Sequence, residues 1–477
     1  MENKLDKANK FVEAEKGKVV KKFYPDINFA GPIGWINDPN GLSLVGDDYH
    51  LFYQYHPYSP DHGPMHWGHA KSKDGLNWQD LPIALAPDKD YDKDGVFSGS
   101  AISKDDNLYL MYTGNLVGDK FRQNQNIAWS KDLVNFEKIH KNPVLDEADL
   151  PSNISREHFR DPKIISYKGR YYAVIGTKTD DEVGTVLVYE SDDLENWTYK
   201  SILLSDTSYL GKMAECPDLL IFGQKALLLV SAMDYFDGSY TYPHKTLMVY
   251  GQMDFDKFTF TPLEKREMDL GFDYYAPQSV KEDGGFAAIS WQQNWGEALI
   301  PGILGHKWMG QMTILQKIFL KEGRIKRSIH PKVLANKNLV ESIEDIGSIS
   351  IKTNSYIKIQ FAKRGAKALR LNFKNPAENF SFDFNIEENT GYLDRSKIKY
   401  MDLYEKDNFK KKEFNLDFED ENKLEIIFDK SSIQIYINDT YSISNTYYSE
   451  NPLADLEISL LGDGRLDRIS TYKLKED

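Results

Sequence analysis

A pair of short motifs that recurs about every 60 residues constrains the fold of this chain more than any other feature. The first motif is an apolar, strand-like run after a turn, and it occurs at residues 49–54, 108–112, 171–175, 226–230 and 286–290. The second is a polar turn that ends in an aromatic residue, and it occurs at residues 72–78, 130–136 and 191–197, with a weaker copy at 254–258. From Ser72 to Ser130 is 58 positions, and from Ser130 to Ser191 is 61. Chance recurrence of aromatic strands does not explain two motifs in phase, so the repeat indicates a structural unit.

Each unit has room for about four short strands, which is typical of a propeller blade. Alternating apolar residues at 356–361 and 432–437 then predict strands with one solvent-exposed face, and Asn438-Asp439 predicts a hairpin turn after the second of them. We therefore expect an all-β fold, a five-bladed β-propeller followed by a C-terminal β-sandwich. The expected parts are a helical or extended N-terminal segment (1–24), the propeller (25–325), a linker (326–340) and the sandwich (341–477).

Length, charge and cysteine content limit the cellular location and the classes of partner that we expect for this chain. The chain has 477 residues, more than one compact core normally holds. Its net charge of −14 disfavours nucleic acid and anionic membranes as partners. One cysteine precludes an intrachain disulfide, the charged N-terminus does not resemble a secretory signal, and no apolar run could span a bilayer. These features predict a cytoplasmic protein and leave its oligomeric state open.

Three carboxylates stand where the innermost strands of the blades begin, namely Asp38, Asp161 and Glu215. Innermost strands surround the channel of a propeller, so these groups should meet at one of its mouths. Close carboxylates raise at least one pKa, which lets one group stay protonated while another is ionised. Glycoside hydrolysis needs such a pair. Taken singly, Asp38 before a proline could be a turn residue, and Asp161 could form a structural ion pair with Arg160.

Aromatic and polar residues near these carboxylates could bind a sugar. Four tryptophans offer flat apolar faces for sugar rings: Trp35, Trp67, Trp291 and Trp295. Blades two and five place Ser98 and Tyr275 at the level of the carboxylates, where they would be ligands rather than acids. The implied partner is a small sugar, and no cofactor is expected.

At these motifs the chain resembles glycoside hydrolase family 32, which contains invertases, fructanases and sucrose-6-phosphate hydrolases. The matching blocks lie at residues 35–41, 52–55, 67–69, 97–100, 160–162, 215–218, 275–278 and 392–396. The resemblance implies that Asp38 is the nucleophile, Glu215 the general acid/base and Asp161 the stabiliser of the transition state, in a retaining double displacement. It also implies a substrate-binding set of Trp35, Asn37, Gln54, Phe97, Ser98, Arg160, Tyr275 and Trp295.

Two places depart from the pattern of the family. His62 stands where many relatives carry a tryptophan, and residues 314–318 read Ile-Leu-Gln-Lys-Ile where relatives usually read Leu-Pro-Arg-Glu-Leu. The four histidines within residues 56–69 could suggest zinc, but a hydrogen-bonded loop rim is the preferred interpretation, and no metal is expected. Cys216 is expected to be a small buried neighbour of Glu215 rather than a nucleophile.

The leading hypothesis is a glycosidase that cleaves terminal non-reducing β-D-fructofuranosyl bonds of sucrose 6-phosphate, sucrose or short fructooligosaccharides. An inverting, arabinanase-like glycosidase and a non-catalytic sugar-binding propeller are the alternatives. A phosphate on the leaving sugar would need basic residues nearby. The candidates for that role are His62, Arg122, Lys178 and Lys245.

Overall fold

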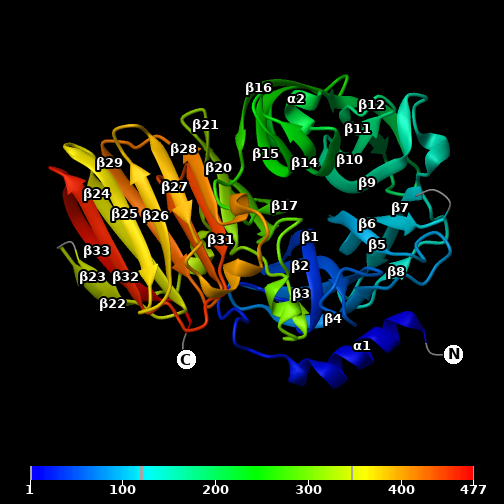
Figure 1. The fold of residues 1–477 in the computed structure, drawn as a ribbon. Helices are drawn as coiled ribbons and strands as arrows, with labels where there is room; N and C mark the ends of the chain where they lie inside the picture. Colours follow the sequence, from blue (N-terminus) through cyan, green and yellow to red (C-terminus); the bar gives the residue numbers. More distant parts are fainter. Residues whose placement is uncertain (1–2, 119–121, 345–346, 476–477) are drawn as a thin grey trace.

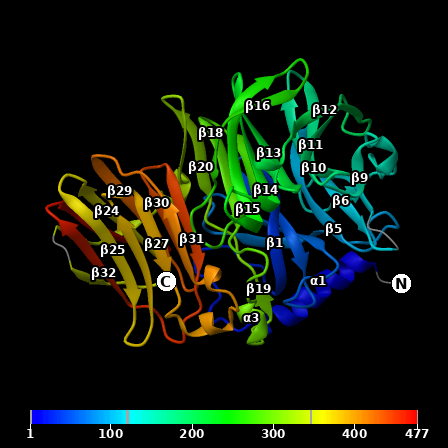
Figure 2. The same cartoon turned by 45° about the horizontal axis from the view of Figure 1, so that its top comes forward.

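Two β-rich bodies lie side by side in the computed structural model, which describes residues 3–118, 122–344 and 347–475 (Figures 1 and 2). The first is a ring of five antiparallel sheets and the second a pair of six-stranded sheets. The predicted fold class, a five-bladed propeller followed by a sandwich, is confirmed. Within the described ranges, no helix is long and apolar enough to cross a membrane.

Each blade of the propeller is one copy of the sequence repeat. Blade one contains β1 (Gly34–Val45), β2 (Asp48–His56), β3 (His66–Ser72) and β4 (Gln79–Leu85), with β19 (Trp308–Met309) added in parallel beside β1. Blade two contains β5 (Val96–Lys104), β6 (Asn107–Leu116), β7 (Arg122–Ser130) and β8 (Glu137–Lys138), and blade three contains β9 (Ile154–Tyr167), β10 (Arg170–Thr179), β11 (Gly184–Ser191) and β12 (Thr198–Ser205). Blade four contains β13 (Met213–Phe222), β14 (Lys225–Phe236), β15 (Thr241–Asp254) and β16 (Thr259–Glu267), and blade five contains β17 (Tyr275–Glu282), β18 (Gly285–Trp291), β20 (Gln316–Lys321) and β21 (Arg324–Ile329).

The innermost strands β1, β5, β9, β13 and β17 each contact the innermost strand of the next blade, and β17 closes the ring against β1. All five carry a β-bulge, which lies near the start of β1, β5, β13 and β17 and in the middle of the longer β9. The pairing with the second strand skips between Ile36 and Pro39 in blade one, and at the equivalent place in the other blades. A bulge re-aims side chains and ends regular pairing, so five bulges at one level open the mouth of the channel.

Backbone strain is concentrated at the same level. Asp161, Cys216 and Ala276 have φ of 62°, 45° and 52°, in the left-handed region that side chains rarely adopt. A proline follows each of them, whereas blade two has Gly99, where a Cβ would lie 2.0 Å from the carbonyl oxygen of Met111. Such strain often accompanies a functional site.

The sandwich consists of two six-stranded sheets packed face to face. One sheet contains β22 (Asn338–Ile343), β33 (Arg465–Lys473), β24 (Ser355–Ala362), β29 (Glu421–Phe428), β30 (Ser432–Ile437) and β31 (Tyr441–Thr446). The other contains β23 (Ser348–Ser350), β32 (Asp455–Gly462), β25 (Ala366–Lys374), β26 (Asn379–Asn385), β27 (Thr390–Asp394) and β28 (Lys411–Asn415). The predicted hairpin turn is present, since Asn438 and Asp439 both have φ of 52° between β30 and β31.

One expectation for the sandwich was wrong. Residues 432–437 form a strand, but all six are buried, so the strand has no solvent-exposed face. The propeller covers the outer face of this sheet. The backbone of Ile314 donates to Gln434, and the backbones of Asp26, Ile27 and Asn28 donate to the Asp429 carboxylate.

Helices are few and short. The longest of the described helices, α1 (Lys4–Glu15), packs on β4 and buries Ala8 and Val12. The others are α2 (Thr207–Leu210), α3 (Ile300–Ile303) and the 3₁₀ turns η1 (Lys16–Lys18), η2 (Glu147–Asp149), η3 (Pro331–Leu334), η4 (Lys399–Leu403) and η5 (Asp407–Phe409). Since β21 ends at Ile329 and β22 begins at Asn338, we propose a domain boundary between these two strands, narrower than the predicted linker.

Candidate active site

The bulges bring the predicted residues together at one mouth of the channel, in two adjacent layers. One layer holds the residues just before Pro or Gly, which are Asp38, Ser98, Asp161, Cys216 and Ala276. The other holds the residues one position earlier, which are Asn37, Phe97, Arg160, Glu215 and Tyr275. Glu215 is therefore offset by one residue from Asp38 and Asp161. All three carboxylates stand at the bulges of innermost strands, and Asp161 lies in the middle of β9 rather than at its start, where it was expected.

Asp38 is held by neighbours from three blades. Ser98 donates to its Oδ2 at 2.7 Å, and Asn37 donates to its Oδ1 at 3.0 Å. The thiol of Cys216 lies 3.5 Å from Asp38 Oδ2 and 3.5 Å from Asp161 Oδ2, so it joins the two carboxylates. Trp35 in turn donates to Asn37 at 2.7 Å and holds that amide in place. These contacts fix the direction of the Asp38 carboxylate.

Each oxygen of the Glu215 carboxylate accepts a hydrogen bond from a different side chain. Arg160 Nη2 donates to its Oε1 at 2.8 Å, and the hydroxyl of Tyr275 donates to its Oε2 at 2.5 Å. Arg160 Nε also lies 3.9 Å from Asp161 Oδ2, so the guanidinium bridges two of the three carboxylates. On the far side of Tyr275, His244 Nδ1 lies 3.2 Å from the same hydroxyl.

The electrostatics of the three carboxylates differ. Burial raises the pKa of Asp161 to about 7, and the charges of Glu215 and Asp38 add to this against the attraction of Arg160. Burial also raises the pKa of Asp38, although Ser98 and Asn37 stabilise its ionised form. For Glu215, burial is outweighed by Arg160 and Tyr275, and its pKa is lowered. Burial and like charges therefore favour the protonated form at Asp161, whereas Arg160 and Tyr275 favour the ionised form at Glu215.

Comparison with known proteins fits this geometry. The model of the N-terminal domain of glycosyl hydrolases family 32 matches residues 28–331, and that of the family 32 C-terminal domain matches residues 320–476. This chain belongs to glycosyl hydrolase family 32. It is accordingly a glycosidase.

Relatives of this family 32 chain match it over most of its length. A sucrose-6-phosphate hydrolase of Zymomonas mobilis is 32% identical over 92% of this chain and 89% of its own. A raffinose invertase of Escherichia coli is 35% identical over 68% of each chain. The solved β-fructofuranosidase of Bombyx mori is 27% identical, with a TM-score of 0.85 and coverage of 99% of this chain and 98% of its own.

An aromatic wall borders the site, and it includes His62, where the family pattern led us to expect a tryptophan. Trp295 stacks on Trp35, with ring centroids 5.9 Å apart, and Trp35 itself is only 1% exposed. The His62 ring stands edge-on to Trp35, Trp295 and Phe97. Burial lowers the pKa of His62, which favours a neutral imidazole in the wall.

Two buried residues join blade one to the start of blade two. Gln54 donates to the carbonyl oxygen of Val96 and Trp67 to that of Phe97. Trp67 and Trp291 are both fully buried, so the idea that they offer flat faces to a sugar is wrong.

Sequence reasoning missed several residues of the site. Thr113 accepts from the backbone of Asp161, and Gln123 and His158 contact Arg160 Nη1. His244 lies on β15, an outer strand of blade four, with no motif around it. Thr113, Gln123 and His244 belong to second or third strands, so only the propeller geometry brings them to the mouth, and His158 lies on the innermost strand β9, two residues before Arg160.

The structure also gives positions for the unusual stretch 314–318 and for the histidines of residues 56–69. Residues 314–318 lie on blade five, where Gln316 is buried and Lys317 forms an ion pair with Glu282, away from the carboxylates. The loop histidines have separate partners, since His56 contacts the carbonyl of Asp61 and His69 contacts His50. Over residues 3–118, 122–344 and 347–475, no group of three or more potential ligands is arranged to hold a metal ion.

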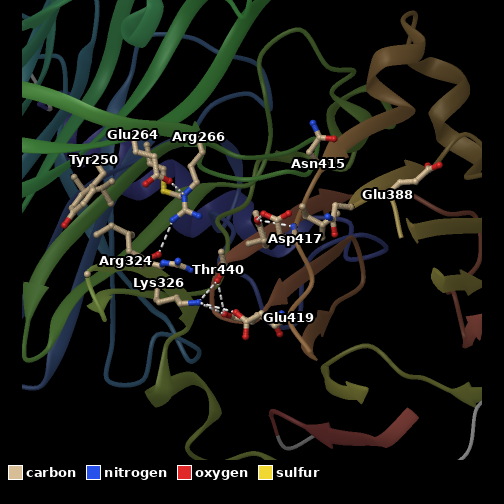
Figure 3. Close-up of a pocket in the computed structure, with 18 residues that line it drawn as sticks. Tyr250, Glu264, Arg266, Arg324, Lys326, Glu388, Asn415, Asp417, Glu419 and Thr440 are labelled. Atoms are coloured by element: carbon tan, nitrogen blue, oxygen red, sulfur yellow. Dashed lines mark hydrogen bonds and ion pairs between the residues drawn. The ribbon is translucent and has the colours of Figure 1, made fainter. Parts of the chain in front are cut away.

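A cavity of about 750 Å³ lies away from the carboxylates, between blades four and five and the sandwich (Figure 3). The residues labelled there carry charges of both signs, and Arg266 lies beside Glu264 and Lys326 beside Glu419. None of the three catalytic candidates lines it. The candidate active site is therefore the mouth of the channel, where the carboxylates converge.

Proposed function

We propose that this chain is a retaining β-fructofuranosidase that hydrolyses the terminal non-reducing β-D-fructofuranosyl bond of sucrose 6-phosphate, sucrose or short fructooligosaccharides. The observation that carries the proposal is the convergence of Asp38, Asp161 and Glu215 at one mouth, with Arg160 and Cys216 joining them in pairs. The names of the relatives support the substrate class, and the Bombyx mori enzyme has been solved, as a variant, with sucrose.

In the proposed mechanism, the Asp38 carboxylate attacks the anomeric carbon while Glu215 gives its proton to the departing glycosidic oxygen. Water then attacks the fructosyl ester of Asp38, and Glu215 takes the proton of that water. The ester bond breaks, fructose is released and both carboxyl groups return to their starting states. Asp161 stabilises the oxocarbenium-like transition state and holds sugar hydroxyls.

Neighbouring residues prepare these groups. Ser98 and Asn37 fix the orientation of the Asp38 carboxylate by hydrogen bonds, and Arg160 and Tyr275 orient Glu215 in the same way. Because the same two contacts lower the pKa of Glu215, its acid form is most populated at acidic pH. Phe97 and Trp295 supply apolar surface, Trp35 packs behind Trp295, and Gln54 holds the start of blade two through its hydrogen bond to Val96.

Substitution of the proposed nucleophile tests this function. Asp38→Asn should lower kcat on sucrose or sucrose 6-phosphate by at least about 10³-fold, because no covalent intermediate can form. The control is circular dichroism of the folded variant. Wild-type protein that hydrolyses none of the three substrates, or a variant with near wild-type turnover, would contradict the proposal.

The stereochemical course separates the alternatives. Proton NMR of the first-formed fructose should show the β-anomer, as a double displacement requires. Net inversion would favour an arabinanase-like reaction, and membership of family 32 already disfavours the non-catalytic reading. The cytoplasmic location also stays a proposal, which cell fractionation would test.

A further inference from the structure

A layer of polar side chains follows the carboxylates along the innermost strands. It lies two positions after the layer that holds Asp38 and Asp161, and it has a polar residue in every blade. Its members, which we call the polar layer, are Asn40, Ser100, Lys163, Asp218 and Gln278. Each of them is buried, with an exposed fraction of 7% or less. Buried polar groups are costly unless they are hydrogen-bonded, so the contacts of the layer indicate what it does.

Three members of the polar layer join blades through neutral hydrogen bonds. Asn40 accepts from the backbone of Gly99 at 3.2 Å, and Gln278 donates to the carbonyl oxygen of Gly99 at 3.1 Å. Ser100 donates to the carbonyl oxygen of Pro162 at 2.7 Å. Blades one and five are thereby joined to blade two, and blade two is joined to blade three.

The other two members form a buried ion pair that joins blades three, four and five. Lys163 Nζ donates to Asp218 Oδ2 at 2.9 Å. It also donates to the carbonyl oxygen of Ser279 at 2.5 Å, and the backbone N–H of Ser279 donates to Asp218 Oδ2 at 2.6 Å. A lysine on β9, an aspartate on β13 and the backbone of β17 are therefore in mutual contact. These contacts hold the three strands in a fixed register.

The same three strands carry Glu215 and both side chains that donate to its carboxylate. On β9, β13 and β17, a residue at the mouth precedes a residue of the joint by three or four positions, and these pairs are Arg160 and Lys163, Glu215 and Asp218, and Tyr275 and Ser279. The two donors come from the blades on either side of Glu215. Hydrogen bonds weaken steeply as their geometry departs from the ideal, so both depend on how the three strands are placed.

The ion pair is balanced in charge, so we expect it to affect Glu215 through position. The fields of two opposite charges in contact oppose each other at a third group. The ionisable groups that face Glu215 itself come from five strands, and they are Asp38 of β1, His158, Arg160 and Asp161 of β9, Cys216 of β13, His244 of β15 and Tyr275 of β17. A buried ion pair also adds little net stability over neutral groups of similar size.

We propose that Lys163 and Asp218 are positioning residues for the general acid. By fixing β9, β13 and β17 in register, they hold Arg160 and Tyr275 against the Glu215 carboxylate. This inference rests on the proposed function, which makes Glu215 the acid. The ion pair acts on the reaction through these two donors and not by contact with the sugar.

The test neutralises both charges of the pair at once. In the double variant Lys163→Met/Asp218→Asn the net charge is unchanged, no buried charge loses its partner, and the new amide can still accept from the backbone of Ser279. Looser strands should weaken the hydrogen bonds to Glu215, so its pKa should rise. On sucrose and sucrose 6-phosphate, the alkaline limb of kcat/KM should move to higher pH and the maximum should fall by about 10-fold or more.

The matched control is the double variant Lys317→Met/Glu282→Gln. It also neutralises an ion pair that involves an innermost strand, but at the far end of β17 from Tyr275. Its alkaline limb should stay at the wild-type position. A limb that does not move in the folded Lys163→Met/Asp218→Asn variant would overturn the proposal, because a purely structural pair leaves the acid unchanged. An equal shift in the control would overturn it as well.

A crystal structure of the Lys163→Met/Asp218→Asn variant gives a measurement that does not depend on turnover. At least one of the hydrogen bonds from Arg160 and Tyr275 to Glu215 should be lost. If the wild type is active and both hydrogen bonds persist in the variant, the positioning role is wrong. If the wild type cleaves none of the proposed sugars but a hydrogen bond is lost in the variant, the proposed function fails and the positioning of Glu215 by the pair stands.

Discussion

Glu215 shows how two single contacts can set the protonation of a catalytic candidate. A general acid needs its proton at the working pH, yet Arg160 and Tyr275 both favour the ionised form. The alkaline limb of kcat/KM reports the pKa of the acid in the free enzyme. That limb should consequently lie at low pH, and its position should depend on these contacts.

Removing one contact gives a signed prediction. Tyr275→Phe deletes the hydrogen bond that stabilises the Glu215 carboxylate, so the pKa of Glu215 should rise. The alkaline limb of the kcat/KM profile should move to higher pH, while the maximum falls by about 10-fold or more because the orientation of Glu215 is lost. A limb that stays in place or moves to lower pH would show that Glu215 is not the acid.

At the residue scale, the sequence predicted which carboxylates meet but not how they are aligned. Asp38, Asp161 and Glu215 stand in specific motifs of equivalent strands, which is enough to place them at one mouth. The offset of Glu215 can also be read from the motifs, because Cys216 separates it from Pro217 whereas Asp38 and Asp161 directly precede a proline. The contacts that align each carboxylate depend on the bulges, which the motifs do not encode. His244 could not be found, because it reaches Tyr275 from a neighbouring blade.

The polar turns of the repeat form the joint between the third and fourth strands of blades one to four. In each of the three strong copies, one aspartate side chain accepts from a serine, two backbone amides and an asparagine. These aspartates are Asp74, Asp132 and Asp193. In the weaker copy, Asp254 keeps the two backbone contacts. The sequence repeat is thus a repeat of one hydrogen-bonded turn.

Disrupting one turn should loosen one blade. Asp193→Ala removes contacts to Ser191, Glu195 and Asn196, and should lower the free energy of unfolding by about 1–3 kcal/mol. The asparagine contacts lower the pKa of Asp193 against the effect of burial, so this stabilisation is present above the unfolded-state pKa of about 3.9 and is lost as the pH falls below it. Urea unfolding at pH 7 and pH 3 should show a smaller wild-type advantage at pH 3. An equal deficit at both pH values would contradict this account.

At the element scale, strands with a repeated pattern could be predicted, and contacts between sheets could not. The apolar runs are β2, β6, β10, β14 and β18, the second strands of the blades. The short strand β19 has only two residues and no repeat partner, so no pattern marks it. The covered face of β30 was missed because alternation reports polarity along a strand, whereas burial there is imposed by another domain.

On the scale of the whole molecule, a buried ion cluster ties the sandwich to the propeller. Arg395 is fully buried and donates to Asp273 at 2.7 Å and to Glu297 at 3.2 Å. It also donates to the carbonyl oxygens of Thr446 and Phe409. Burial and the charge of Asp273 raise the pKa of Glu297, so at neutral pH one guanidinium faces one carboxylate and one neutral carboxyl group.

The raised pKa of Glu297 predicts different effects on stability for two substitutions in this cluster. Glu297→Gln mimics the protonated acid and should change the free energy of unfolding by less than about 1 kcal/mol. Arg395→Leu leaves Asp273 buried without its counter-charge and should cost about 3–5 kcal/mol. Chemical denaturation of both variants at pH 7 checks this. A Glu297→Gln variant as unstable as Arg395→Leu would mean that Glu297 is ionised.

The lone cysteine has a practical consequence for work on this enzyme. Cys216 is 7% exposed, and burial beside two carboxylates raises the pKa of its thiol well above the ordinary value. Thiolates are the reactive form, so alkylating dyes at neutral pH should leave it untouched. The native cysteine therefore need not be removed before a reactive cysteine is introduced for labelling. A single cysteine engineered on the sandwich and another on the propeller would carry a fluorophore pair that follows the two bodies during turnover.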